Sequence, residues 1–294
     1  MSSEQLQSVA VTTEPAPTVL GGTVNAVVTI TGEPDRKVRG AKAQLVRTAL
    51  HRVTQTNLSG RGSHESLLHE AVVITEVPVG SSGGPVVPGE HAVSLNIPED
   101  GLPSATDQVT WSVRAVIDRR HGADTQAESP IEVVAGPERF AVEADSDPRY
   151  KGERCIDLEL SVRTLRPGET ITGTVTLQPT RAIKVTEVVV TLVVTLPARK
   201  GLEGSAVTHQ LLLDEQVDLR PSDSKSLPFE LTLPADAAPT VRGSLTTPRC
   251  HAIISWDVGA VAKCVPLEDD KKEINGFAYV GINVYNAEPG QVPR

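Results

Sequence analysis

The chain carries TVNAVVTI at residues 23–30 and TITGTVTL at residues 170–177, two segments with the same spacing of apolar side chains. Three further pairs of segments follow in the same order: residues 45–46 with 192–193, residues 95–98 with 231–234, and residues 111–116 with 256–261. The chain has two tryptophans, and they fall at equivalent places in the last pair. A repeat of about 147 residues has the size of a whole domain. The sequence therefore predicts two copies of one domain in tandem.

The boundary between the copies is expected at a polar stretch in the middle of the 294-residue chain. We expect an N-terminal domain over residues 1–136 and a C-terminal domain over residues 153–294, which ends in a short polar tail. Residues 137–152 lie between them and include Asp145 and Asp147, which favours a linker.

Apolar and polar residues alternate along most of the chain. In residues 156–160, IDLEL, three apolar residues alternate with two acidic ones. A period of two is typical of a strand with one buried and one exposed face. Turn residues such as Pro167-Gly168 separate these segments. The sequence predicts an all-β fold of two antiparallel, immunoglobulin-like β-sandwiches, with residues 63–69 as the one candidate for a short helix.

Composition limits the kinds of partner and compartment. A net charge of −9 argues against nucleic acid, and 3% aromatic residues offer few stacking surfaces. Residues 1–10 do not resemble a signal peptide, and no stretch of 18 apolar residues predicts a transmembrane segment. We therefore expect a cytoplasmic protein whose membrane contact, if any, is peripheral.

Three cysteines, Cys155, Cys250 and Cys264, contain no CxxC pair. Cys250 and Cys264 bracket one long predicted strand, which holds them too far apart for a disulfide unless the strand bends. We expect reduced thiols in a cytosolic protein in preference to a disulfide or a metal site.

The order of short motifs in the second half indicates a family. They are Pro167-Gly168-Glu169, Ile171, Gly173, Val175, LPFEL at residues 227–231, Leu233-Pro234 and IISWDV at residues 253–258. This series resembles the arrestin-type domain, although Trp256 stands where that family usually has tyrosine. The resemblance covers residues 155–264, and residues 19–118 more loosely. Two such sandwiches in tandem are the architecture of the arrestin-like family.

The resemblance implies a protein without catalytic activity. Arrestin-like proteins are adaptors that hold membrane-protein tails or signalling complexes, and bacterial relatives resembling sporulation-control proteins are regarded as interaction proteins. We therefore expect a cytoplasmic adaptor or scaffold that binds protein partners through sheet faces, strand edges or the inter-domain cleft. Self-association through a strand edge is a further expectation. The alternatives are a structural subunit of a larger assembly and, less favoured, a small-ligand binder or enzyme that uses the cleft.

Several polar motifs lack the context that chemistry would need. GSSGG at residues 80–84 fits G-x-S-x-G, but no helix follows it. Ser63-His64-Glu65 with His69, and Cys250-His251, place neighbouring side chains on opposite faces of a strand. The acidic turns at residues 32–35 and 268–270 follow no calcium-loop pattern. We predict no catalytic residue, no cofactor and no metal site.

One basic segment is a candidate binding surface. Its predicted members are Arg36, Lys37, Arg39, Lys42 and Arg52, which could together bind an acidic tail, a phosphate group or anionic lipid. The alternative is that these charges solvate a strand and pair with nearby carboxylates, which is the commoner role of such a segment.

Arg47 occupies an unusual place in this segment. The alignment puts it on the inner face of its strand, where the second copy has Val194. An unpaired buried charge is costly, so we expect Arg47 to be paired or to reach the end of the strand. Our hypothesis is that it binds a carboxylate near the domain junction and helps to fix the angle between the domains.

Overall fold

The computed structural model describes residues 7–33, 38–56, 63–80, 86–105, 108–120, 122–140, 148–197, 203–214, 216–242, 253–268 and 272–288. The chain forms two compact units. Unit 1 extends to Gly136, and unit 2 comprises Pro137–Arg242 and Ile253–Asn286. Ala287 belongs to unit 1, where it packs with Val19 and Val134 in one buried cluster.

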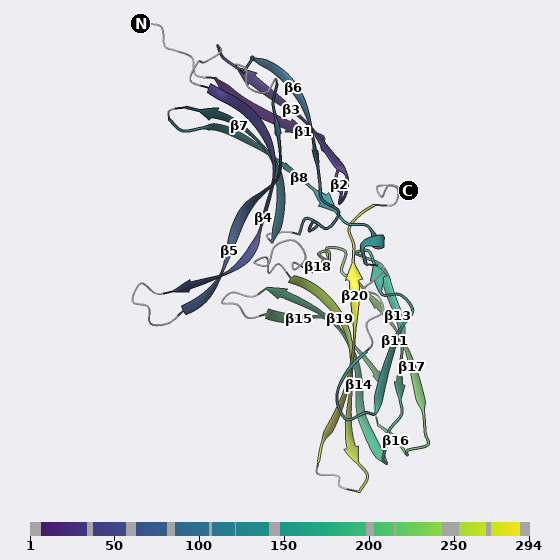
Figure 1. The fold of residues 1–294 in the computed structure, drawn as a ribbon. Helices are drawn as coiled ribbons and strands as arrows, with labels where there is room; N and C mark the ends of the chain where they lie inside the picture. The colour runs from purple at the N-terminus through teal and green to yellow at the C-terminus, as the bar shows by residue number, and fades with distance from the viewer. Residues whose placement is uncertain are drawn as a thin grey trace. The chain divides into compact units, whose positions relative to one another are not determined.

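Unit 1 is a sandwich of two antiparallel sheets (Figure 1). Its strands are β1 (Ser8–Thr13), β2 (Thr18–Val19), β3 (Thr23–Thr31), β4 (Val38–Thr56), β5 (Ser63–Pro78), β6 (Gly89–Asn96), β7 (Val109–Arg119), β8 (Thr125–Ile131) and β9 (Val133–Val134). The small sheet has the order β1-β3-β6, and the large sheet has the order β5-β4-β7-β8. Strands β2 and β9 form a separate parallel pair.

Unit 2 repeats this plan with additional strands. Its elements are η1 (Pro137–Phe140), β10 (Arg149–Gly152), β11 (Ile156–Leu160), β12 (Thr164–Leu165), β13 (Thr170–Leu177), β14 (Ile183–Pro197), β15 (Glu203–Asp214), β16 (Val217–Leu219), β17 (Lys225–Thr232), β18 (Val241–Arg242), β19 (Ile253–Pro266) and β20 (Ile274–Val284). The small sheet is β11-β13-β17, and the large sheet has the path β10-β20-β19-β14-β15. η1 and β10 lie within the predicted linker.

Alternation builds the core of each sandwich. On β3, Val24, Ala26, Val28 and Ile30 are buried while most of the residues between them are exposed. On β14, Val188, Val190 and Leu192 are fully buried. The prediction of an all-β fold made of antiparallel sandwiches is confirmed.

The predicted short helix at residues 63–69 is wrong. These residues begin β5, which pairs with β4 from Thr56 opposite Ser63 to Lys42 opposite Pro78, with one register shift between Leu45 and Val46. A long hairpin satisfies the backbone groups of both strands at once, and this pairing outweighs the weak capping signal of Ser63.

Equivalent tryptophans make equivalent hydrogen bonds in the two units. Trp111 Nε1 donates to the carbonyl of Leu102 at 2.9 Å, and Trp256 Nε1 donates to the carbonyl of Ala238 at 3.0 Å. Each acceptor lies in the segment that leads from the small sheet to the large sheet. The indole group therefore fixes the chain where it passes between the two layers.

Two further features recur at equivalent positions. The N–H of Val133 donates to Ser104 Oγ at 2.9 Å, and the N–H of Val284 donates to Thr240 Oγ1 at 2.8 Å. The turns before β3 and β13 contain Gly21 and Gly168 with φ of 80° and 82°, a left-handed conformation that favours glycine.

Replacing Trp111 by phenylalanine is expected to lower the free energy of unfolding by about 1–3 kcal/mol, because the buried carbonyl of Leu102 loses its donor. Trp256→Phe is the matched variant in unit 2 and should destabilise that unit. Each variant retains one tryptophan, so urea unfolding followed by fluorescence reports on the unmutated unit and circular dichroism reports on the whole chain. Wild-type unfolding curves for both variants would contradict this role.

Candidate binding surface

The structure places the predicted basic residues unevenly. Arg36 and Lys37 lie outside the described residues, and Arg52 lies on β4 at a position whose side chain is not among those described. Arg39 is exposed on β4. Lys42 is half-buried, and its Nζ lies 3.0 Å from Glu76 Oε2 on the neighbouring strand β5. Lys42 is thus engaged in the kind of ion pair that the alternative interpretation expected.

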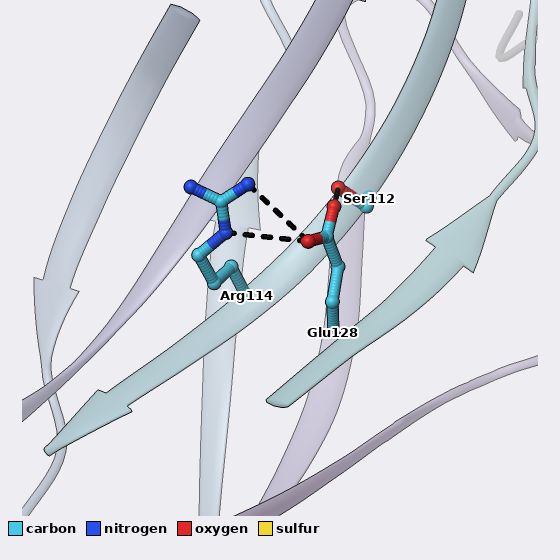
Figure 2. Close-up of polar contacts among 3 residues, drawn as sticks. All are labelled: Ser112, Arg114 and Glu128. Carbon is cyan, nitrogen blue, oxygen red and sulfur yellow. Dashed lines mark hydrogen bonds and ion pairs between the residues drawn. The ribbon is translucent and has the colours of Figure 1, made fainter. Parts of the chain in front are cut away.

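Two polar clusters cross the large sheet of unit 1. In the first, Glu76 on β5 accepts a hydrogen bond from Gln44 Nε2 at 2.7 Å as well as pairing with Lys42. In the second, Glu128 on β8 accepts from Ser112 Oγ and from Arg114 Nε and a terminal nitrogen at 3.3 and 3.2 Å (Figure 2). Both carboxylates are already paired, which makes this part of the sheet a satisfied polar surface.

The electrostatics of Glu76 follow from these contacts. The hydrogen bond from Gln44 and then that from Lys42 lower the pKa of Glu76 below its ordinary value of 4.5. Burial opposes the shift, but the side chain is 45% exposed, so this opposition is small.

Arg47 is buried as the alignment predicted, with 2% of its surface exposed. It lies directly opposite Trp111 in the pairing of β4 with β7, and its guanidinium carbon is 5.9 Å from the centre of the indole ring. Val194 lies opposite Trp256 at the equivalent place in unit 2. The ring therefore supplies a cation–π contact to the buried charge, and the proposed carboxylate partner stays a prediction.

The edges of the two large sheets expose apolar side chains. Strand β5 ends the large sheet of unit 1 and β15 ends that of unit 2 (Figure 1). Val207 and Leu212 on β15 are 59% and 50% exposed, and Val73 on β5 is 44% exposed. All residues from 205 to 210 are exposed. Sequence alternation did not indicate these edges, because it does not reveal which strand ends a sheet.

The exposed valines occupy equivalent positions. Val73 lies opposite Val46 on β4, and Val207 lies opposite Val193 on β14. Val46 and Val193 are aligned in the internal repeat. Each unit thus exposes one valine on its edge strand, opposite a valine that is buried in unit 1 and half-buried in unit 2.

The polar motifs are scattered among different parts of the chain. Ser63 to Glu65 lie on β5 without described side chains, and residues 81–85 and Cys250-His251 lie outside the described residues. Within the described part of the chain, no group of three or more His, Cys, Asp or Glu residues is arranged to hold a metal ion. The same residues contain no helix with the length and apolar character needed to span a membrane.

The structure brings together two residues that the sequence did not connect. Cys155 and Cys264 are both buried, and their Sγ atoms are 4.0 Å apart. Their separation of 109 positions conceals this contact, which depends on how the two sheets of unit 2 face each other.

Comparison with known proteins gives a match to a family model and similarity to solved structures. Residues 151–254 match the family model described as SpoOM protein. This range contains most of the motifs that resemble the arrestin-type domain, and the match supports the expected similarity of this region to sporulation-control proteins. No curated protein matches the chain.

A crystal structure of Spo0M, a sporulation control protein from Bacillus subtilis, is similar at 19% sequence identity with a TM-score of 0.36. The match covers 47% of this chain and 51% of that chain, so this chain spans about half the length of the related structure.

Replacing Glu76 by glutamine is expected to alter stability in a pH-dependent way. The pKa of Glu76 is lower in the folded chain, so its charge stabilises the fold above the ordinary pKa and this contribution is lost as the pH falls through the folded value. The difference in the free energy of unfolding between wild type and Glu76→Gln should be largest near neutral pH. This difference should stay below about 1 kcal/mol, because the ion pair is exposed. Parallel stability curves from about pH 3 to 7 would contradict it.

Replacing Arg47 by methionine keeps an apolar stem but removes the guanidinium over Trp111. We expect the free energy of unfolding to fall by about 1–2 kcal/mol, measured by thermal or urea unfolding. Arg39→Met is the matched control, because Arg39 is exposed on the same strand and its loss should change stability by no more than about 0.5 kcal/mol. Equal melting temperatures for Arg47→Met and wild type would remove this role.

Proposed function

We propose that the protein is a non-enzymatic adaptor or scaffold that binds an extended segment of a partner protein as an added strand at β15. The observation that carries the proposal is the edge of the large sheet in unit 2, where the side chains of Val207 and Leu212 are exposed to solvent. A regulatory role is in keeping with the similarity of residues 151–254 to the SpoOM family.

The sequence of β15 supports strand addition. Edge strands usually avoid pairing with other chains through lysine, proline or inward-pointing charges. Residues 203–214, EGSAVTHQLLLD, contain no lysine or proline and carry their two acids at the ends. The middle of the strand therefore lacks these side-chain protections, and its pairing with β14 contains two register shifts.

The same edge favours a particular kind of partner. An added strand gains main-chain hydrogen bonds along its length and specificity from alternate side chains. At this edge, exposed Val207 lies opposite half-buried Val193, and exposed Leu212 lies opposite buried Val189. We infer that the partner segment is extended, uncharged at its centre and apolar at every second residue.

The internal repeat supports a duplication as the origin of the chain. We propose two arrestin-type domains, over residues 1–136 and 153–294, that derive from one sandwich. The basic segment of Arg36, Lys37, Arg39, Lys42 and Arg52 remains a second candidate surface, for acidic or phosphate groups.

Substituting Val207 by lysine should weaken capture of the partner at least about tenfold, because a buried apolar contact is replaced by a charge that must be desolvated. Leu212→Lys should act in the same direction. Val162→Lys is the matched control, since Val162 is also an exposed valine of unit 2, at 48%, and lies outside β15. Capture is measured in extracts of the native host after crosslinking from a photoreactive residue placed at exposed position 205 of β15 in the wild type and in every variant.

The crosslinked product distinguishes the proposed classes. A different protein that is lost with Val207→Lys and retained with Val162→Lys supports the adaptor. Crosslinks mainly to a second copy of this chain would contradict the adaptor function and support a role as a structural subunit of a larger assembly. Equal capture by both variants would place the binding surface away from β15.

A further inference from the structure

Two buried thiols in unit 2 lie within reach of each other. Cys155 and Cys264 are 1% and 0% exposed, both are free thiols, and their Sγ atoms are 4.0 Å apart. Cys155 immediately precedes β11 of the small sheet, whereas Cys264 lies on β19 of the large sheet. A bond between them would join the two layers of the sandwich.

The strand beside the pair leaves space for the Cys155 thiol. A Cβ atom at Gly276 on β20 would lie 2.6 Å from Cys155 Sγ, so the absence of a side chain there lets the sulfur enter the layer. Disulfide formation requires the two sulfur atoms to close from 4.0 Å to about 2.0 Å. Side-chain rotation supplies a movement of this size.

The contact between the thiols gives them different acidities. The hydrogen bond between the sulfurs lowers the pKa of Cys155 and raises that of Cys264. The direction of the two shifts favours Cys155 as the nucleophilic thiolate, while burial opposes the charged form of either thiol. Cys264 is placed to resolve an oxidised Cys155.

A pocket lies beside the segment that contains Cys155. A pocket of about 350 Å³ is lined by Tyr150, Arg154, Ile156, Asp157 and Gln178. Arg154 and Ile156 flank Cys155 in the sequence, so the residues on either side of this cysteine line the pocket. A peroxide is small enough to enter such a space.

We propose that Cys155 and Cys264 form a modification site in which a peroxide converts the dithiol into a disulfide between the two sheets. The Cys155 thiolate attacks one oxygen of hydrogen peroxide, and the O–O bond breaks. Hydroxide is the leaving group, and Cys155 becomes a sulfenic acid. Cys264 then attacks this sulfur, and the S–O bond breaks with release of water as the S–S bond forms. The two sulfurs lose two electrons, which reduce one peroxide to water.

The experiment uses the full chain with Cys250→Ser, which leaves only the proposed pair. After treatment with hydrogen peroxide under native conditions, both thiols should disappear together, with a mass loss of about 2 Da, and a non-reduced peptide map should contain Cys155 linked to Cys264. The melting temperature of the oxidised form should rise by about 5 °C or more, since the bond closes a long loop. Dithiothreitol should restore both thiols and the original melting temperature.

Two variants in the same background serve as controls. Adding Cys155→Ser or Cys264→Ser should abolish the mass loss and the rise in melting temperature, leaving one thiol or its oxygen adduct. Should either variant fold poorly, the peptide map of the unmutated chain decides the question, because it distinguishes the Cys155–Cys264 link from links to Cys250. Two titratable thiols persisting in folded Cys250→Ser, or links only between different molecules, would overturn the proposal.

Discussion

A buried indole N–H needs a hydrogen-bond acceptor, and in each unit that acceptor is a backbone carbonyl on the segment between the two sheets. Trp111 holds Leu102 in this way, and Trp256 holds Ala238. The tryptophan belongs to the large sheet, and the segment it holds arrives from the small sheet. One side chain thereby sets where the chain crosses between layers, and the packing of alternating apolar residues on both sides depends on that crossing point.

The same constraint explains how the two units tolerate different residues opposite the ring. Val194 meets the indole face as an ordinary core residue, whereas Arg47 meets it as a buried cation. The ring is apolar enough for the first and carries a negative face for the second. A charge can thus replace an aliphatic side chain at this position without altering the pairing of the strands.

Much of the fold was predictable because it rests on short-range patterns. Alternation indicated the strands, and the gapless alignment indicated that Arg47 points inward. The prediction of a short helix at residues 63–69 was wrong because it rested on a weak local capping signal. The pairing of these residues with β4, which outweighs that signal, cannot be read from the sequence. The contact of Cys155 with Cys264 and the position of β15 at an edge depend on the facing of sheets and on strand order. These are properties of the assembled unit, so no local pattern contains them.

The short parallel pairs at the ends of each unit have a mechanical consequence. In unit 1, β2 near the beginning pairs with β9 at the end, and in unit 2, β12 pairs with the final strand β20. Because β1 precedes β2, and β10 and β11 precede β12, tension on the ends of a unit reaches these parallel strands after the earlier strands have separated. It then pulls the two parallel strands in opposite directions along their length. The hydrogen bonds between them then bear the load together rather than opening one after another. Each parallel pair is thereby suited to resist further stretching after the strands before it have separated.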